Sequence, residues 1–198
     1  MRIQPDKFID PLNYTEYCEL LNEENILQMP EHLQAYTRLN YQRMHRWQKT
    51  YQPSQKAVES VSSNRKIKHA FIITEPWCGD AAHCIPAIQK LLLLTNGLLN
   101  IVYLLRDRNL ELMDLFLTNG KRSIPIVVLT DENFQVIGKW GPRPNKSQIV
   151  VNEAREREQN NDKWKEELQM WYNHDKQQQL EEEMIELIHQ CNYDSKIC

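Results

Sequence analysis

The chain has 198 residues, a net charge of −3 and 41% hydrophobic residues, which is enough for one folded domain with a real core. No basic stripe with interleaved aromatic residues is present, so we expect no nucleic-acid binding. Apolar stretches such as Leu91 to Leu94 are too short to cross a bilayer, and no signal-peptide pattern follows Met1 to Lys7. Five widely spread cysteines suit a reducing compartment, so we predict a cytoplasmic protein without a membrane partner.

Residues 1–65 are predicted to form a helical extension. A short helix is expected from Asn13 to Leu21, with Asn13 as its cap, and a longer one from Glu31 to Thr50. The longer helix carries apolar and aromatic residues at spacings of three and four on one face, namely Leu33, Tyr36, Asn40, Met44 and Trp47. Such a stripe favours packing against the rest of the domain over a binding surface.

Residues 66–150 are predicted to form an α/β core. Apolar runs, turn residues and helical periodicity predict strand Lys68–Thr74, helix Asp80–Leu94, strand Asn100–Leu105, helix Leu110–Leu117 and a hairpin of Pro125–Thr130 with Val136–Lys139. Strand and helix alternate first, and a hairpin closes the order. This pattern predicts a mixed sheet flanked by helices.

Residues 151–198 are polar and are predicted to be helical throughout. One side carries an apolar stripe, made up of Trp164, Leu168, Trp171, Leu180, Met184, Leu187 or Ile188, and Cys191. This stripe can fold back on the Glu31–Thr50 helix or bury against a second subunit, so a homodimer through the helical extensions is one prediction. Cys191 and Cys18 are expected on apolar helix faces, whereas Cys198 is expected to be mobile.

Cys78 lies where the first core strand gives way to a helix. A sulfur there meets the unpaired N–H groups and the positive dipole end of the helix, which favour the thiolate. The alternative is an inert, buried cysteine at a tight turn. His83 with Cys78 and Cys84 could suggest a metal site, but the chain has no Cys-x2-Cys pair, so we predict neither metal nor cofactor and interpret His83 as an exposed partner of Asp80.

Three segments in order resemble the thioredoxin superfamily, over roughly residues 66–150. They are Trp77-Cys78-Gly79-Asp80, Ser123-Ile124-Pro125 and Trp140-Gly141-Pro142-Arg143-Pro144. More closely, they are similar to a group of bacterial thioredoxin-like proteins that carry Trp-Cys-Gly-Asp in place of Trp-Cys-Gly-Pro-Cys. The resemblance implies a thioredoxin-like fold with Cys78 as the reactive residue.

The resemblance also implies a substrate groove beside Cys78. In the family, the residue matching Pro125 has a cis peptide bond next to the active sulfur, and the preceding backbone, here Ile124, pairs with an extended substrate. Sequence alone also permits an ordinary trans proline at the start of an edge strand. The other residues that the resemblance assigns to the binding site are Trp77, Gly79, Asp80, Trp140 and Arg143.

Two departures from the family pattern bear on activity. The second cysteine of thioredoxins is replaced by Ala81, and the next cysteine, Cys84, follows Cys78 by six residues. Six helical residues rise about 9 Å, whereas a disulfide needs Cα atoms within about 7 Å, so pairing with Cys84 requires the first turn to unwind. The buried Asp of thioredoxins is replaced by Ile72.

A carboxylate that assists Cys78 must therefore come from Glu75 or Asp80. Asp80 in the first helical turn suits the helix dipole, but its charge opposes thiolate formation. Arg143 is expected to offset that charge if its loop approaches Cys78, and a solvated Arg143 is the alternative.

These observations leave three functions open. The leading one is a thiol-disulfide oxidoreductase that acts on a protein disulfide or a low-molecular-weight thiol through Cys78, with Cys84, Cys198 or an outside thiol resolving the mixed disulfide. Its expected sign is a pKa of Cys78 well below the free-thiol value of about 8.5. The second is a binding module whose groove holds a peptide without turnover, and the third is a thiol peroxidase, for which Thr74 and Arg143 are the available helpers.

Overall fold

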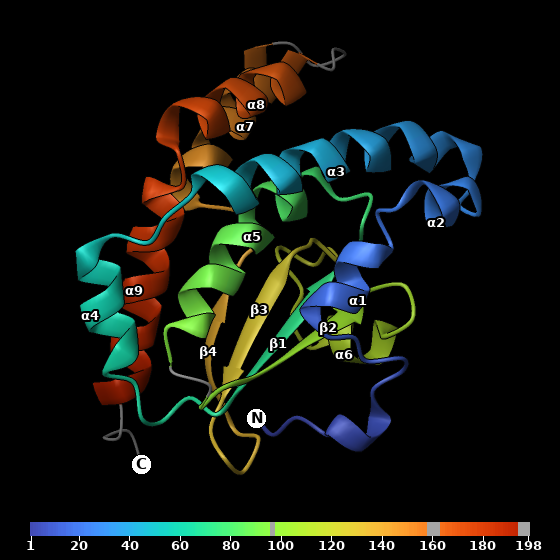
Figure 1. Cartoon of the computed structure of the whole chain (residues 1–198). Helices are drawn as coiled ribbons and strands as arrows, with labels where there is room; N and C mark the ends of the chain where they lie inside the picture. The colour runs from blue at the N-terminus through green and yellow to red at the C-terminus, as the bar shows by residue number, and fades with distance from the viewer. Residues whose placement is uncertain (96–97, 158–162, 194–198) are drawn as a thin grey trace.

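The computed structural model describes residues 1–95, 98–157 and 163–193 (Figure 1). A 3-10 turn at Pro5–Lys7 precedes the α-helices. These are α1 Tyr14–Glu19, α2 Glu23–Leu27, α3 Glu31–Thr50, α4 Gln55–Ser62, α5 Gly79–Leu93, α6 Leu110–Asp114, α7 Asn145–Arg157, α8 Lys163–Asp175 and α9 Gln178–Tyr193. The strands are β1 His69–Thr74, β2 Asn100–Leu105, β3 Ile126–Thr130 and β4 Val136–Trp140.

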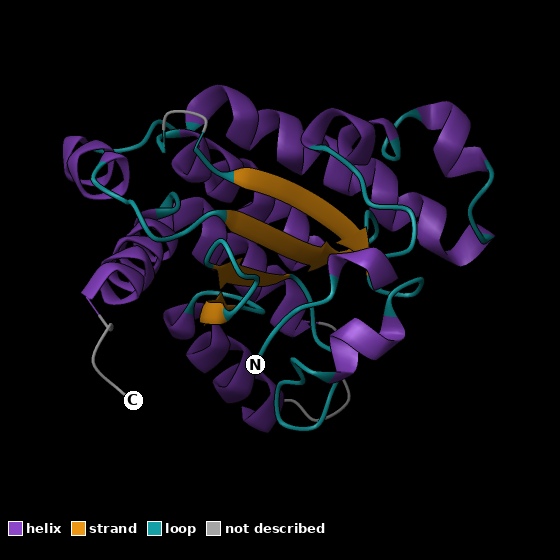
Figure 2. Cartoon of the chain, turned by 90° about the horizontal axis from the view of Figure 1, so that it is seen from below, coloured by secondary structure: helices purple, strands orange, loops and turns teal. Residues whose placement is uncertain are grey.

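The four strands form one mixed sheet in the order β2-β1-β3-β4. β1 pairs in parallel with β2, which follows it through α5, whereas β1 with β3 and β3 with β4 are antiparallel. β1 and β3 are central and buried on both faces, in keeping with their unbroken apolar runs, Ala70 to Ile73 and Ile126 to Leu129. Figure 2 looks along the sheet and shows helices on both of its sides. The predicted fold class is confirmed.

Other segments of the chain cover both edges of the sheet. At β2, Leu12 exchanges backbone hydrogen bonds of 2.9 and 2.8 Å with Tyr103, so the N-terminal segment covers this edge. At β4, the Cys191 Sγ of α9 donates to the Ile137 carbonyl at 3.3 Å. Gly138 of β4 lies under the same helix, because a Cβ atom there would meet the Cys191 Sγ at 2.7 Å. Covering the edges removes sites where another strand could add.

The N-terminal helices pack over the core. α1 begins with a capping box in which Asn13 and Glu16 satisfy each other's backbone N–H groups. α3 crosses over α5 (Figure 1) and buries Met44 and Trp47 against it. The predicted stripe on α3 is wrong at Tyr36, which is 49% exposed, because the first turns of this helix extend past α5 toward α2.

The C-terminal helices fold back on the same chain. α7 and α8 pack together, and α9 lies against β4, α4 and α5 (Figure 1). The predicted stripe is divided between α8 and α9 by a turn at Lys176 and Gln177, which both have positive φ angles. Leu168, Leu180 and Met184 are buried, and so is Cys191. The stripe packs on the core rather than chiefly on α3.

Smaller differences from the predicted elements have local causes. α6 ends at Asp114, before the predicted Leu117, because the N–H groups of Leu115 and Phe116 bond to carbonyls three residues back and tighten the turn. A backbone bridge between Thr118 and Lys121 then closes a turn through Asn119-Gly120. Cys18 is half-buried. None of the described helices is long and apolar enough to span a bilayer.

Candidate functional site

Cys78 is the N-cap residue of α5, directly after the loop that leaves β1. Its side chain is buried, with 8% of the residue exposed, and its Sγ donates to the Ile124 carbonyl at 3.4 Å. The backbone N–H groups of Asp80 and Ala81 point at the sulfur and favour its anionic form. The sulfur therefore lies between the first turn of α5 and the residue before Pro125.

The segment around Pro125 is held by a close backbone contact. The Ile124–Pro125 peptide bond is cis, and so is the Gly141–Pro142 bond. Gly141 has a φ of 119°, and a Cβ atom there would lie 2.2 Å from the Pro125 carbonyl oxygen. Only glycine fits this approach, which brings the end of β4 and its following loop against the wall of the site.

Asp80 is buried beneath Cys78 and has two partners. The Arg143 Nη2 forms an ion pair with its Oδ2 at 2.6 Å, and the side chains of Arg143 and Asp80 are 15% and 10% exposed. The Tyr172 hydroxyl of α8 donates to its Oδ1 at 2.8 Å. Burial raises the pKa of Asp80, while Arg143 and Tyr172 act in the opposite direction. The expected approach of the Arg143 loop is thus present, and its ion pair is with Asp80.

The expectation of a lowered pKa at Cys78 is wrong in this structure. Burial, first, and then the charge of Asp80 raise the pKa of the thiol to about 12. The N–H groups of the first turn and the Arg143 guanidinium oppose this shift without reversing it. The surroundings of Cys78 in this structure therefore favour the protonated thiol over the thiolate.

Cys84 lies on another face of α5 from Cys78, and both are free thiols. It is fully buried, and its sulfur contacts the Tyr172 hydroxyl at 3.6 Å. Burial raises the pKa of Cys84 well above its ordinary value. A bridge to Cys78 would require the first turn of α5 to unwind. Cys198, the other internal candidate for resolution, lies outside the described residues.

His83 is not the exposed residue that the sequence indicated. It is 3% exposed, and the Trp47 Nε1 donates to its Nδ1 at 3.0 Å. Its protonated Nε2 therefore donates to the Gln169 Oε1 at 3.1 Å, and its ring stacks on Tyr172 with centroids 4.1 Å apart. Burial lowers the pKa of His83 to about 3, so the ring is neutral at physiological pH. The helices that cover α5 explain the difference.

Arg43 of α3 also reaches the site, and the sequence pattern did not single it out. Its Nη1 lies so close to Gly79 that a Cβ atom there would be 3.3 Å away. Asn40 holds this arrangement, because it accepts from the Arg43 Nη1 at 3.0 Å and donates to the Pro76 carbonyl at 3.0 Å. On the other side, the Arg43 Nε donates to the Gln169 Oε1 at 2.8 Å.

The thioredoxin family model matches residues 26–157, about two thirds of the chain. The chain belongs to the thioredoxin family. The match begins before α3, so the region that resembles the family includes the helix that carries Arg43.

Two solved structures share the thioredoxin fold of this chain. One is a Pseudomonas aeruginosa protein of unknown function, with a TM-score of 0.56, 15% identity and coverage of 89% of this chain and 97% of the other. The second is an HIV epitope-scaffold, with a TM-score of 0.53, 14% identity and coverage of 89% and 98%. At this identity the likeness extends to the fold alone. No curated protein matches the chain.

Three further residues considered in the sequence analysis of this thioredoxin-family chain, Trp77, Trp140 and Glu75, make side-chain contacts with groups other than the Cys78 sulfur. Trp77 is half-buried beside Cys78, and the Arg106 guanidinium lies over its ring at 4.8 Å from the centroid. Trp140 is buried, and its Nε1 donates to the Glu183 carboxylate of α9 at 2.7 Å. Glu75 is directed to the Asp107 backbone N–H at 2.9 Å, so Asp80 is the carboxylate that acts on Cys78.

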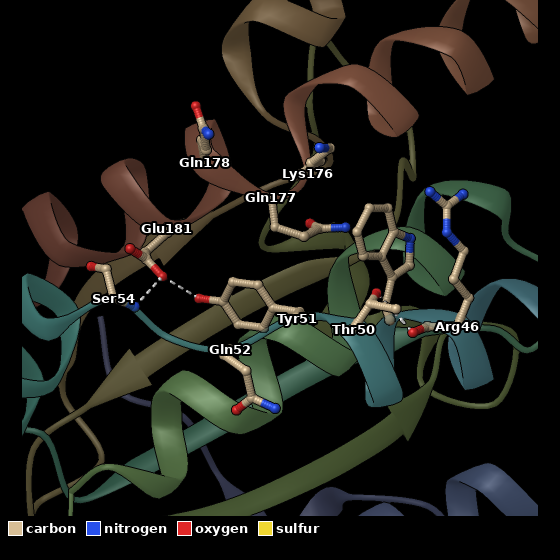
Figure 3. Close-up of a pocket in the computed structure, with 10 residues that line it drawn as sticks. Arg46, Thr50, Tyr51, Gln52, Ser54, Lys176, Gln177, Gln178 and Glu181 are labelled. Atoms are coloured by element: carbon tan, nitrogen blue, oxygen red, sulfur yellow. Dashed lines mark hydrogen bonds between the residues drawn. The ribbon is translucent and has the colours of Figure 1, made fainter.

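A cavity of about 550 Å³ lies away from these residues, between the C-terminal end of α3 and the turn that joins α8 to α9 (Figure 3). None of the predicted site residues lines it. Inside, the Tyr51 hydroxyl and the Ser54 N–H donate to the Glu181 carboxylate at 2.5 and 3.1 Å. Gln177 connects this region to α5 by donating to the His83 carbonyl at 3.0 Å. The cavity is separate from the thiol site.

Proposed function

We propose that this thioredoxin-family protein catalyses thiol-disulfide exchange through Cys78 as its single nucleophile. The observation that carries the proposal is the position of the Cys78 sulfur, between two N–H groups of the first turn of α5 and the Ile124 carbonyl. That position gives the sulfur donors for a developing negative charge and an adjacent backbone for a substrate. The Trp77-Cys78-Gly79-Asp80 motif supports the same function.

The exchange has two balanced steps. In the first, the Cys78 sulfur attacks one sulfur of a disulfide, a mixed disulfide forms, and the proton lost by Cys78 ends on the departing thiol. In the second, an outside thiol attacks the mixed disulfide, forms a new disulfide with the bound half and returns a proton to Cys78. The net reaction transfers one half of a disulfide between two thiols, and the protein is unchanged.

An outside thiol is the resolving group in this proposal. Cys84 is fully buried, and its sulfur contacts the Tyr172 hydroxyl. To reach a mixed disulfide at Cys78, Cys84 would have to leave its contact with Tyr172 and disrupt the packing of α5 against α8. A small thiol in solution needs no such rearrangement. We therefore assign Cys84 a packing role.

The protonated state of Cys78 makes the resting protein slow. Burial raises the pKa of the thiol to about 12, which lowers the fraction of reactive thiolate at neutral pH. This supports a second candidate function, a binding module in which the groove beside Cys78 holds a partner and Cys78 stays a thiol. The two candidates differ in whether a covalent adduct forms at Cys78.

Trapping the mixed disulfide tests the proposal. The full chain is incubated with a small disulfide, quenched with acid and mapped by mass spectrometry of its peptides. We expect an adduct on Cys78 that a second thiol removes, in the wild type and in Cys84→Ala but not in Cys78→Ser. If Cys78 carries no adduct while exposed thiols react, the exchange function fails and the binding module stands.

A further inference from the structure

The N-terminal helix α3 contributes a cation to the rim of the thiol site. Arg43 touches Gly79, the residue next to Cys78, and both Arg43 and Gly79 are half-buried rather than enclosed. Its hydrogen bonds use Nε and Nη1, which hold the guanidinium against Asn40 and Gln169. These two hydrogen bonds restrain the orientation of the guanidinium group.

The charges around the sulfur do not cancel. Two guanidinium groups, from Arg43 and Arg143, accompany one carboxylate, Asp80, and both cations interact with it electrostatically. Tyr172, the other titratable partner of Asp80, is a neutral hydroxyl, because burial raises its pKa well above the ordinary value. The neighbouring Arg106 is paired with Asp107 at 2.8 Å. These described groups leave an excess of one positive charge.

Arg143 cannot supply this charge to a ligand as readily as Arg43. Its Nη2 is bound to Asp80, and its Nε is buried. Arg43 has a less direct relation to Asp80, since the closest partners of its Nε and Nη1 are the neutral amides of Gln169 and Asn40. A partly buried cation with neutral partners attracts an anion more strongly than one already paired with a carboxylate.

From this arrangement we infer that Arg43 is a specificity-determining residue, and that the site selects disulfides with a carboxylate close to the reacting sulfur. The inference rests on the proposed exchange at Cys78. A carboxylate matches the planar donor fork of a guanidinium. Such a group is present in small sulfur compounds derived from amino acids and in protein disulfides flanked by Asp or Glu.

Two disulfide probes separate charge recognition from thiol reactivity. Dithiobisnitrobenzoate carries a carboxylate on each ring, whereas dithiodipyridine is uncharged at neutral pH. The rate of reaction at Cys78 is measured with both probes for the full chain and for Arg43→Gln, with the Cys78→Ser rate subtracted. We expect Arg43→Gln to slow the anionic probe about tenfold and the neutral probe less than twofold.

The ratio of the two rates removes other effects of the substitution. A change in the pKa of Cys78 alters the thiolate fraction that is available to both probes and therefore cancels in the ratio. Arg43→Lys keeps the charge and should restore most of the ratio. Arg38→Gln is the matched control, because Arg38 lies on the same helix but pairs with Glu23 at 2.6 Å.

The outcomes separate the role of Arg43 from the exchange function of Cys78. If Cys78 reacts with neither probe, the exchange function fails. If it reacts with both and Arg43→Gln leaves the ratio as in the wild type, the exchange function stands and the role of Arg43 is overturned. A second experiment, which measures the rates with peptide disulfides flanked by Glu or by Gln, tells whether the carboxylate belongs to a protein or to a small molecule. A Glu preference that Arg43→Gln abolishes indicates a protein substrate, and a preference confined to small disulfides indicates a small one.

Discussion

The Tyr172 hydroxyl of α8 donates a hydrogen bond of 2.8 Å to the Asp80 carboxylate, across 92 residues of sequence. The same hydroxyl lies 3.6 Å from the Cys84 sulfur, and its ring stacks on His83. A helix of the C-terminal region therefore holds the first turns of α5 in place, and with them the position of Cys78. The C-terminal helices are part of the structural support of the site.

Tyr172→Phe should lower the free energy of unfolding by about 2 kcal/mol, because it leaves one oxygen of a buried carboxylate without its donor. Urea unfolding followed by circular dichroism measures the change. Tyr36→Phe is the control, since Tyr36 is 49% exposed and its hydroxyl removal should cost less than about 0.5 kcal/mol. Equal stabilities for the two variants would contradict the assigned role of Tyr172.

Asp80→Asn and Arg143→Gln should move the reactivity of Cys78 in opposite directions. The charge of Asp80 raises the pKa of the thiol, and that of Arg143 lowers it. At a pH below the pKa of Cys78, the alkylation rate follows the thiolate fraction. Lowering this pKa by about one unit therefore raises the rate about tenfold, and raising it has the reverse effect. Iodoacetamide labelling at a fixed pH, with Cys78→Ser as background, should show faster reaction for Asp80→Asn and slower reaction for Arg143→Gln.

The two variants also test whether the ion pair itself matters. Each leaves one charged group largely buried without its partner, which should cost about 3 kcal/mol of stability. Labelling is therefore done in conditions where circular dichroism shows both to be folded. If both substitutions change the alkylation rate in the same direction, electrostatic control of Cys78 by this pair is excluded.

Gly141→Ala should be among the most destabilising single substitutions in the loop after β4. The added Cβ atom would lie 2.2 Å from the Pro125 carbonyl oxygen, and the φ of 119° is rarely adopted by L side chains. We expect a loss of at least about 3 kcal/mol in urea unfolding, together with slower exchange at Cys78. Gly120→Ala is a useful comparison, since its φ is 73° but no atom lies within 4 Å of the added Cβ. A loss no greater than that of Gly120→Ala would contradict the close contact.

Much of the fold follows from local patterns in the sequence. The predicted Glu31–Thr50 helix and Asn100–Leu105 strand have the bounds of α3 and β2, and the other core strands and α5 differ by one or two residues. Strong periodicity and turn residues at Asn13 and Asn119-Gly120 account for this agreement. The local pattern also predicted the hairpin of β3 with β4, whereas the position of β1 between β2 and β3 depends on contacts between distant segments that local pattern does not specify.

The sequence predicted only part of the candidate site, and it assigned the distant residues Ile124, Pro125 and Arg143 through the family resemblance. Cys78 and Asp80 follow from the strand-to-helix junction. Two further residues at the site were not predicted, because they come from distant helices: Arg43 from α3 lies against Gly79, and Tyr172 from α8 donates to Asp80. Burial of Cys78 also shifts its pKa upward, in the direction opposite to the one expected. The one local signal was Asn40, a polar residue in an otherwise apolar stripe, which in the structure holds both Arg43 and Pro76.

Glu75 should make the stability of the protein depend on pH. Burial raises its pKa from 4.5 to about 7, although the Asp107 N–H opposes the shift. The folded state thus holds this proton more tightly than the unfolded state, so the contribution is fully present below about pH 4.5 and is lost as pH rises through about 7. The change is at most about 3 kcal/mol over that interval.

Glu75→Gln removes this titration and keeps an oxygen for the Asp107 N–H. We expect its free energy of unfolding in urea to vary less between about pH 5 and pH 7.5 than that of the wild type, with the variant the more stable of the two at the upper value. Glu132→Gln, at an exposed position, should leave the wild-type slope unchanged. If Glu75→Gln and the wild type show parallel pH profiles, Glu75 does not titrate in this interval, and its buried carboxyl is stabilised as a charge by the N–H and by Arg106 and Arg108.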